Sequence, residues 1–450
     1  MFEQVDTLAW LILIVAAVVA HVVLVILARY ANVMALLTGA FVVLSLASTA
    51  KDVPYLDLLR LARTYCAILA VGVGILHLRL LKFQAASMIY FAFILFYVIA
   101  GTWSDDPTSA MLRKTIYAGP MFMGILLAYS IRSRRDLDIS IRVLAISAAI
   151  LAVFLLIPFL RDFGAANRLG PWGINPNRLG TVAGSMTLIC VYVALYDSSR
   201  IWKVVSWAAA SAFCMMILYT GSRSAVVYTL LGCFVIAMPL MRRPLALALL
   251  VLAVLGTGWF LQDVMVPTRA TERLTEEASL TGRDVIWAEG MAMYSESPLI
   301  GAGWATERQI GGGLADTINL HNIYVQALAE TGLVGLSLLL LALIIASVYA
   351  LVALRGLRGV REFQPGLYFA GGAFGAALAH GLVASSALSG SNIPAVLLPF
   401  CIGLFERLPM LARSEETRLE EEPLDSWDAA GLAEYGVDLY QPDSQVNAVS

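Results

Sequence analysis

Arginines and one histidine stand where polar residues interrupt the long apolar segments of this chain. Arg223 lies in a Gly-Ser-Arg-Ser-Ala break between two apolar runs, Arg283 precedes Asp-Val-Ile-Trp, and His321 begins His-Asn-Ile-Tyr. The planar fork of an arginine can hold two phosphate oxygens at once, and a neutral imidazole can accept a proton. This combination could transfer a group from a diphosphate leaving group to a hydroxyl acceptor.

Each of these residues also has a structural explanation. Arg223 could anchor a helix end by extending its guanidinium to the membrane surface, and an ion pair with Asp284 or Glu289 would account for Arg283. His321 could be an interfacial or capping residue. We favour a ligand for Arg223, because an arginine held against a bilayer is costly unless it is paired or occupied.

A turn-rich segment supplies further candidates. Arg168 and Arg178 bracket a Pro-Trp-Gly-Ile-Asn-Pro-Asn sequence that ends in Asn177. Its asparagines could simply satisfy turn geometry. We expect Arg168, Arg178, Asn177 and Asn322 to bind substrate, with the structural alternative left open.

The elements that must position these residues are membrane-spanning helices. Of the 450 residues, 60% are hydrophobic and 14% are charged, whereas soluble chains carry about 25% charged residues. Apolar runs long enough to cross a bilayer recur throughout the chain. We predict an all-α polytopic bundle of about 12–13 transmembrane helices. Its expected partners include membrane lipids and exclude nucleic acid. The runs lie at about 8–28, 32–50, 62–78, 85–102, 114–131, 142–160, 179–196, 204–220, 225–241, 245–262, 333–354, 367–388 and 393–408.

Basic residues predict the orientation of these spans. Arg132, Arg134 and Arg135 mark one connection as cytoplasmic, and the alternation of spans brings several other basic connections to the same side. The opposite side then faces away from the cytoplasm, which in a bacterial inner membrane is the periplasmic side. The other basic residues on the cytoplasmic side are Arg79, Lys82, Arg200, Lys203, Arg242, Arg243, Arg355, Arg358 and Arg361.

Three regions follow from this layout. Residues 1–160 form N-terminal transmembrane helices, and residues 161–408 form a membrane domain with a large periplasmic loop at 263–320. In that loop we expect a helix at 283–296, stopped by Pro298. Residues 409–450 form an acidic cytoplasmic tail that we expect to be disordered.

The helix that follows His321 should be broken. A single helix over 320–354 would be about 50 Å long, which exceeds the hydrocarbon thickness of a membrane. Thr331 and Gly332 are the natural division. Asn319 is the candidate N-cap, which places His321 in the first helical turn, where the helix dipole favours a neutral ring.

Neither a metal nor a cofactor is expected. The five cysteines lie mostly in apolar runs without paired spacing, and the periplasmic side carries no cluster of metal-ligand residues. Arginine charge would therefore have to stabilise a phosphate leaving group.

Six short segments of the chain, taken in order, resemble the O-antigen ligase and polymerase superfamily of bacterial envelope assembly. The resemblance covers about residues 165–350. It implies an all-helical bundle related to the C-type membrane glycosyltransferases, which takes glycans from undecaprenyl diphosphate without a metal, and it assigns the family's two arginines and histidine to Arg223, Arg283 and His321. The matching segments are Asn175–Asn177, Gly221–Ala225, Thr281–Arg283 with Ile286–Trp287, Ser297–Gly303, His321–Gln326 and Glu330–Gly335.

The expected function is an inverting, metal-independent glycosyl transfer at the periplasmic face. The donor would be an undecaprenyl-diphosphate-linked glycan, and the acceptor either another lipid-linked glycan, as in a polymerase, or lipid A–core, as in a ligase. The alternative is a transporter or flippase for polysaccharide or lipid-linked glycans. A transporter is expected to have charged residues at the bilayer midplane and internal repeats. In this sequence the charged residues gather at one face of the membrane.

Overall fold

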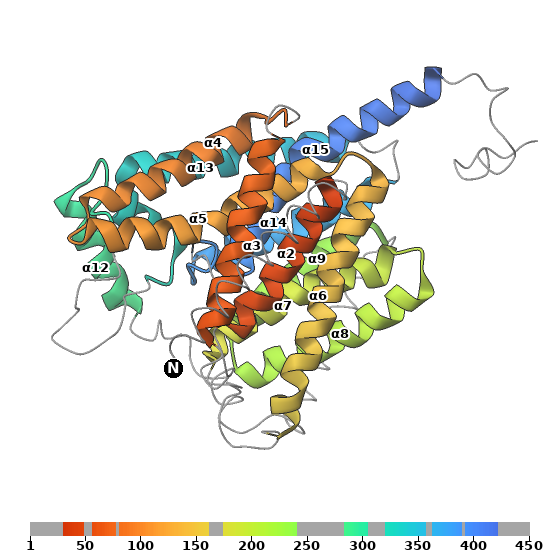
Figure 1. The fold of residues 1–450 in the computed structure, drawn as a ribbon, viewed down its shortest axis with the longest axis horizontal. Helices are drawn as coiled ribbons and strands as arrows, with labels where there is room; N and C mark the ends of the chain where they lie inside the picture. The colour runs from red at the N-terminus through yellow and green to blue at the C-terminus, as the bar shows by residue number, and fades with distance from the viewer. Residues whose placement is uncertain are drawn as a thin grey trace, which may run out of the picture.

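Helices make up the fold throughout the part of the chain that the computed structural model describes, and no strand occurs there (Figure 1). The described residues are 30–48, 56–77, 81–161, 174–240, 283–304, 320–356, 362–388 and 392–421. The predicted all-α fold class is confirmed. Eight of the described helices are long and apolar enough to cross a membrane.

Most of the predicted apolar runs coincide with observed helices. The runs at 8–28 and 245–262 lie outside the described residues, so the total of 12–13 spans stays a prediction. The longer helices are α2 (Tyr30–Ala47), α3 (Leu56–Leu76), α4 (Ala85–Ile99), α5 (Pro107–Ser130), α6 (Arg134–Arg161), α7 (Pro176–Tyr196), α8 (Arg200–Thr220), α9 (Arg223–Ala237), α12 (Arg283–Glu296), α13 (Ile323–Gly356), α14 (Gln364–Gly381) and α15 (Pro394–Glu421), with short 3-10 helices η2 (Ala100–Trp103) and η4 (Met238–Leu240).

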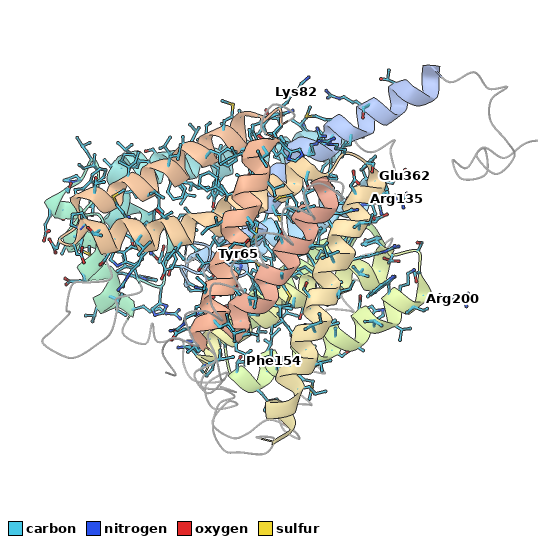
Figure 2. All side chains as sticks on the ribbon, in the orientation of Figure 1. Tyr65, Lys82, Arg135, Phe154, Arg200 and Glu362 are labelled. Carbon is cyan, nitrogen blue, oxygen red and sulfur yellow. The ribbon has the colours of Figure 1, made fainter. Side chains whose placement is uncertain are left out.

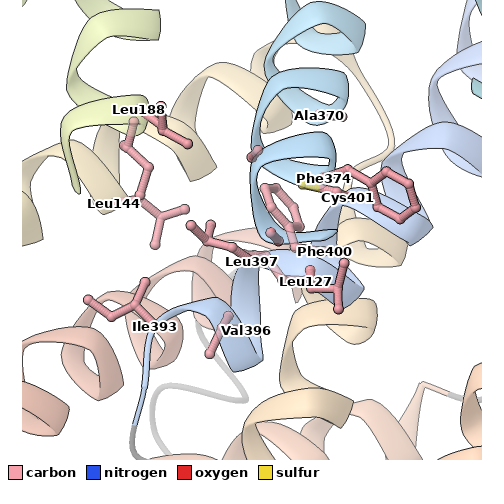
Figure 3. Packing of buried hydrophobic residues seen from close by; sticks show 14 of the residues in the cluster. Leu127, Leu144, Leu188, Ala370, Phe374, Ile393, Val396, Leu397, Phe400 and Cys401 are labelled. Atoms are coloured by element: carbon pink, nitrogen blue, oxygen red, sulfur yellow. The ribbon is translucent and has the colours of Figure 1, made fainter. Parts of the chain in front are cut away.

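Helices α7 and α15 form the interior of the bundle. In the apolar windows of these two helices 89% and 83% of the residues are buried, against 22% for α3. Helix α15 packs against α5 and α14, and α7 packs against α8 and α9. Figure 3 shows this packing where Phe400 and Leu397 of α15 meet Leu127 of α5 and Phe374 of α14. The outer helices keep exposed apolar faces, as expected of helices that face lipid.

Side chains of α15 also cap two other helices. Glu406 is 1% exposed, and its Oε1 accepts hydrogen bonds from the backbone N–H groups of Ala86 at 2.8 Å and Ser87 at 3.2 Å. Arg407 Nε donates to the carbonyl of Ile131 at 2.9 Å. These bonds satisfy terminal groups of α4 and α5 that have no partner within their own helices, so α15 fixes this end of the bundle.

The same end of the bundle carries basic connections that were predicted to be cytoplasmic. Figure 2 shows Lys82, Arg135 and Arg200 along one border of the molecule, on the side away from α12. This grouping agrees with the alternation of spans inferred from the sequence. It leaves the ends of the helices near α12 as the opposite face.

The C-terminal helix is longer than the sequence analysis expected. Helix α15 continues to Glu421, past residue 409, where we expected the disordered tail to begin, and Figure 1 shows it projecting beyond the bundle. Leu, Ala, Arg and Glu predominate in this extension, and their high helix propensity sustains the helix. Residues 422–450 lie outside the described residues.

Candidate active site

Four helices begin close to one another at the end of the bundle that includes α12. Gly180 in the first turns of α7 packs so closely on the start of α9 that a Cβ there would lie 3.0 Å from the side chains of Ser222 and Ala225. Trp287 of α12 donates from its Nε1 to the carbonyl of Leu320, just before α13, at 2.9 Å. Each helix N-terminus carries partial positive charge from the helix dipole. Such a convergence favours an anionic ligand.

A tight turn places Arg223 at this end. Gly221 terminates α8 with φ 59°, a left-handed conformation that glycine adopts without strain. Ser222 then serves as the N-cap position, and Arg223 is the first residue of α9. The sequence Gly-Ser-Arg therefore reverses the chain between two spans and presents an arginine at the start of the second.

Arg283 lies within electrostatic range of Arg223. It is the first residue of α12, which confirms the helix predicted at 283–296. Burial, and secondly the charge of Arg223, lower the pKa of Arg283 below its ordinary value. An anion bound between the two guanidinium groups, such as a diphosphate, would offset the unfavourable effect of Arg223 on the charge of Arg283.

His321 stands just before α13 in a strained conformation. Its φ is 47°, and among the described residues no other non-glycine residue has a positive φ. Burial, followed by the charge of Arg283, lowers the pKa of His321 below its ordinary value. The ring is therefore neutral and able to accept a proton at physiological pH. Strained backbone conformations of this kind cluster at functional sites.

The sequence analysis was wrong about how α13 begins. The N-cap is Asn322, whose Oδ1 accepts from the N–H groups of Tyr324 at 2.9 Å and Val325 at 3.0 Å. His321 consequently precedes the helix instead of occupying its first turn, and Asn319 lies outside the described residues. The sequence offers two asparagines three positions apart, and residue type alone does not decide which of them caps the helix. The lowered pKa of His321 comes from burial and from Arg283, not from the dipole to which we attributed it.

The four residues predicted to bind substrate have different surroundings. Asn322 makes the cap described above, and its Nδ2 also donates to the carbonyl of Leu382 at 3.0 Å, so the structure gives it a structural role. Asn177 is exposed in the first turn of α7, where Asn175 is the N-cap. Arg178 lies within electrostatic range of Arg63 on α3 and of Tyr117 on α5. Arg168 lies outside the described residues.

His380 on α14 adjoins the site. Its Nε2 lies 3.3 Å from Thr181 Oγ1 on α7, and its Nδ1 lies 3.3 Å from Ser386 Oγ. The first of these contacts joins α14 to α7. His380 also lies within electrostatic range of Arg283. Its position near the end of an outward-running span was the signal that could have linked it to the site.

Helix α13 is broken where its length predicted. Gly332 has φ 63° and ψ −164° and interrupts the helix. The interruption frees backbone groups on both sides, and the segment Ser297–Trp304 binds them. Leu333 and Val334 donate to the carbonyls of Pro298 and Leu299, while Ala302 and Gly303 donate to those of Ala329 and Glu330, at 2.9–3.2 Å. The Ser-Pro-Leu-Ile-Gly-Ala-Gly sequence thus completes the backbone hydrogen bonding of a broken helix.

The segment that carries these residues is similar to known proteins. Residues 207–340 match the family model described as O-antigen ligase, and this segment contains Arg223, Arg283 and His321. The match supports the O-antigen ligase and polymerase superfamily. The predicted resemblance is thereby confirmed. The chain is also 22% identical, over 274 residues, to the exopolysaccharide production protein ExoQ of Rhizobium meliloti (strain 1021), a match that covers 55% of this chain and 62% of the relative.

Among the described residues no group of three or more His, Cys, Asp or Glu side chains is placed to hold a metal ion. We therefore name no residue of this site as a metal ligand. The charged groups that the site does offer are the guanidinium groups of Arg223 and Arg283, beside the imidazole of His321.

Proposed function

We propose that this chain is a membrane glycosyltransferase of polysaccharide assembly, which moves a glycan from undecaprenyl diphosphate to an acceptor hydroxyl at the periplasmic face. The observation that carries the proposal is the grouping of Arg223, Arg283 and His321 at converging helix N-termini. The group combines fixed positive charge with a neutral base. The matches to the O-antigen ligase family and to an exopolysaccharide production protein support the same class of reaction.

The proposed reaction is a single displacement. The acceptor oxygen attacks the anomeric carbon of the donor, a new glycosidic C–O bond forms, and the C–O bond to the diphosphate breaks. The departing diphosphate takes the bonding electrons, and the acceptor proton passes to the imidazole of His321 and then to solvent. Attack opposite the leaving group inverts the anomeric configuration.

Arginine supplies the charge stabilisation in this scheme. The diphosphate gains negative charge as it leaves, and preorganised positive groups stabilise that charge most effectively in a water-poor site. Arg223 and Arg283 lie within electrostatic range of each other, so their forks can bind oxygens of one diphosphate. The proposal therefore needs no divalent cation.

The acceptor that we propose is a second lipid-linked glycan, as in a polymerase. Support comes from the relative ExoQ, which is named as an exopolysaccharide production protein. Lipid A–core, the acceptor of a ligase, becomes the competing outcome of the test.

The test uses the full chain purified into proteoliposomes with a defined undecaprenyl-diphosphate oligosaccharide. We expect elongated lipid-linked glycan as the product, and loss of that product in His321→Asn. Asparagine tolerates the left-handed backbone of this position and cannot act as the base. Product formed only with lipid A–core would assign a ligase, and undiminished product in the folded His321→Asn protein would refute the role of His321.

A further inference from the structure

Away from the charged site, a lysine and a glutamate form an ion pair in the protein interior. Lys114 Nζ on α5 lies 3.3 Å from Glu330 Oε2 on α13, and both side chains are 0% exposed. The ammonium also donates to the carbonyl of Gly303 at 3.3 Å and lies 4.3 Å from the centre of the Tyr97 ring on α4. One buried cation thus joins α4, α5, α13 and the segment Ser297–Trp304.

Glu330 lies at the far end of the short helix that His321 precedes. The break at Gly332 separates residues 323–331 from the rest of α13, and we call these residues the half-helix. At an axial rise of 1.5 Å per residue, Glu330 lies about 13 Å from His321 along the direction of the helix axis. The pair therefore does not touch the proposed reacting atoms, and any effect on them must act through the half-helix.

The half-helix is tied at both ends. At its start, Asn322 Nδ2 donates to the carbonyl of Leu382, and Tyr324 donates from its hydroxyl to that of Leu378 at 3.3 Å. At its end, Glu330 binds Lys114, and Gln326 Nε2 donates to Glu330 Oε1 at 2.9 Å. The only covalent connection to the long span passes through a glycine. The angle of the half-helix is therefore set by these side-chain contacts and by the backbone bonds to residues 298–303.

A fully buried ion pair is a poor way to gain stability alone. Removing two charges from water is costly, and well-packed apolar replacements often leave a fold equally stable. A buried pair does fix geometry, because each charge must keep its partner in place. In this chain the geometry that it fixes is the approach of the half-helix to α4 and α5.

We propose that Lys114 and Glu330 are positioning residues, which hold the half-helix at the angle that sets His321 against Arg283. The inference rests on the proposed function. Among the described residues, Arg283 on α12 is the charged group whose field reaches His321. Arg223 on α9 and His380 on α14 lie within electrostatic range of Arg283 in turn, and Tyr324 follows on the half-helix itself. Release of the half-helix would expose His321 to water and withdraw it from Arg283.

The test reads the ionisation of His321 directly. The rate of acylation of His321 by diethyl pyrocarbonate is measured against pH by mass spectrometry of its peptide, in the full chain in detergent micelles. The variants are Glu330→Gln, Lys114→Met and the double variant. The matched control is Asp197→Asn, which breaks the Arg142–Asp197 ion pair (2.6 and 3.0 Å) far from the half-helix.

The pH midpoint of His321 acylation in the wild type should lie below 6.5, the ordinary pKa of histidine. In Glu330→Gln this midpoint should rise toward 6.5. Turnover should show kcat reduced about 10- to 100-fold with an unchanged KM, because a shift of about 1 Å near reacting groups costs up to about 100-fold. Asp197→Asn should match the wild type in both readouts. The double variant should regain the thermal stability that Glu330→Gln loses while keeping the raised midpoint.

A folded Glu330→Gln protein with the wild-type midpoint and kcat would overturn the inference. If Glu330→Gln fails to fold, the double variant takes its place in the test. An acylation midpoint equal to that of the wild type then overturns the inference, and a raised midpoint supports it. Acylation needs no turnover. A wild-type protein without transferase activity would therefore refute the proposed function and leave this readout intact.

Discussion

Replacing Gly332 by alanine should destabilise the protein strongly. With φ 63° and ψ −164°, Gly332 occupies a region that is essentially restricted to glycine. A Cβ there would overlap the carbonyl group of Leu299 and lie 2.6 Å from the backbone nitrogen of Gly301. The backbone strain costs about 1–3 kcal/mol, and overpacking costs about 1–3 kcal/mol more. The free energy of unfolding should therefore fall by about 2–6 kcal/mol.

Thermal unfolding in detergent, followed by tryptophan fluorescence, measures this effect. Gly375→Ala is the matched control, because Gly375 lies within α14 and a Cβ there meets nothing within 4 Å. That control should be as stable as the wild type or gain up to about 1 kcal/mol from helix propensity. If Gly332→Ala unfolded at the temperature of Gly375→Ala, the broken helix and its pairing with residues 298–303 would be refuted.

Three further predictions concern the site. The kcat/KM of the enzyme should be constant at neutral pH and fall as pH drops through a pKa below 6.5, since burial and Arg283 lower the pKa of His321. Arg283→Gln should raise that pKa and move the decline in kcat/KM to higher pH. A decline at the same pH as in the wild type would contradict this. Arg223→Lys should lose about 10- to 100-fold in kcat because lysine lacks the fork, and the wild type should keep its activity in EDTA; full activity of the variant, or rescue of chelated enzyme by magnesium, would count against arginine stabilisation. A reporter active only outside the cytoplasm should work when fused after Trp304 and fail after Ser414, and the reverse pattern would invert the proposed orientation.

Local sequence signals predicted much of this fold. Apolar runs of bilayer length identified the spans, and the excess length of 320–354 predicted the break at Gly332, because both follow from the thickness of a membrane. The helix at 283–296 followed from its amphipathic pattern and Pro298. These features depend on neighbouring residues alone.

Features that depend on distant residues could not be predicted. Lys114 is the first residue of the predicted run 114–131 and follows Arg113 directly, and nothing near it in the sequence points to Glu330 as its partner. Asn322, the N-cap of α13, is held by a hydrogen bond to the carbonyl of Leu382, which is distant in the sequence. Similarly, nothing near Arg178 in the sequence indicates that the fold brings it within electrostatic range of Arg63 and Tyr117. The residue types of the site were evident, but their grouping required the bundle.

The ratio of undecaprenyl diphosphate released to glycosidic bonds formed tests the central claim most directly. Purified protein in sealed proteoliposomes would receive a doubly labelled lipid-linked glycan in the presence of EDTA, and both products would be counted over time. We predict one diphosphate carrier released for each bond formed, and neither product in the folded His321→Asn protein. Movement of the intact lipid-linked glycan across the bilayer with no carrier released would instead identify a transporter and contradict the account.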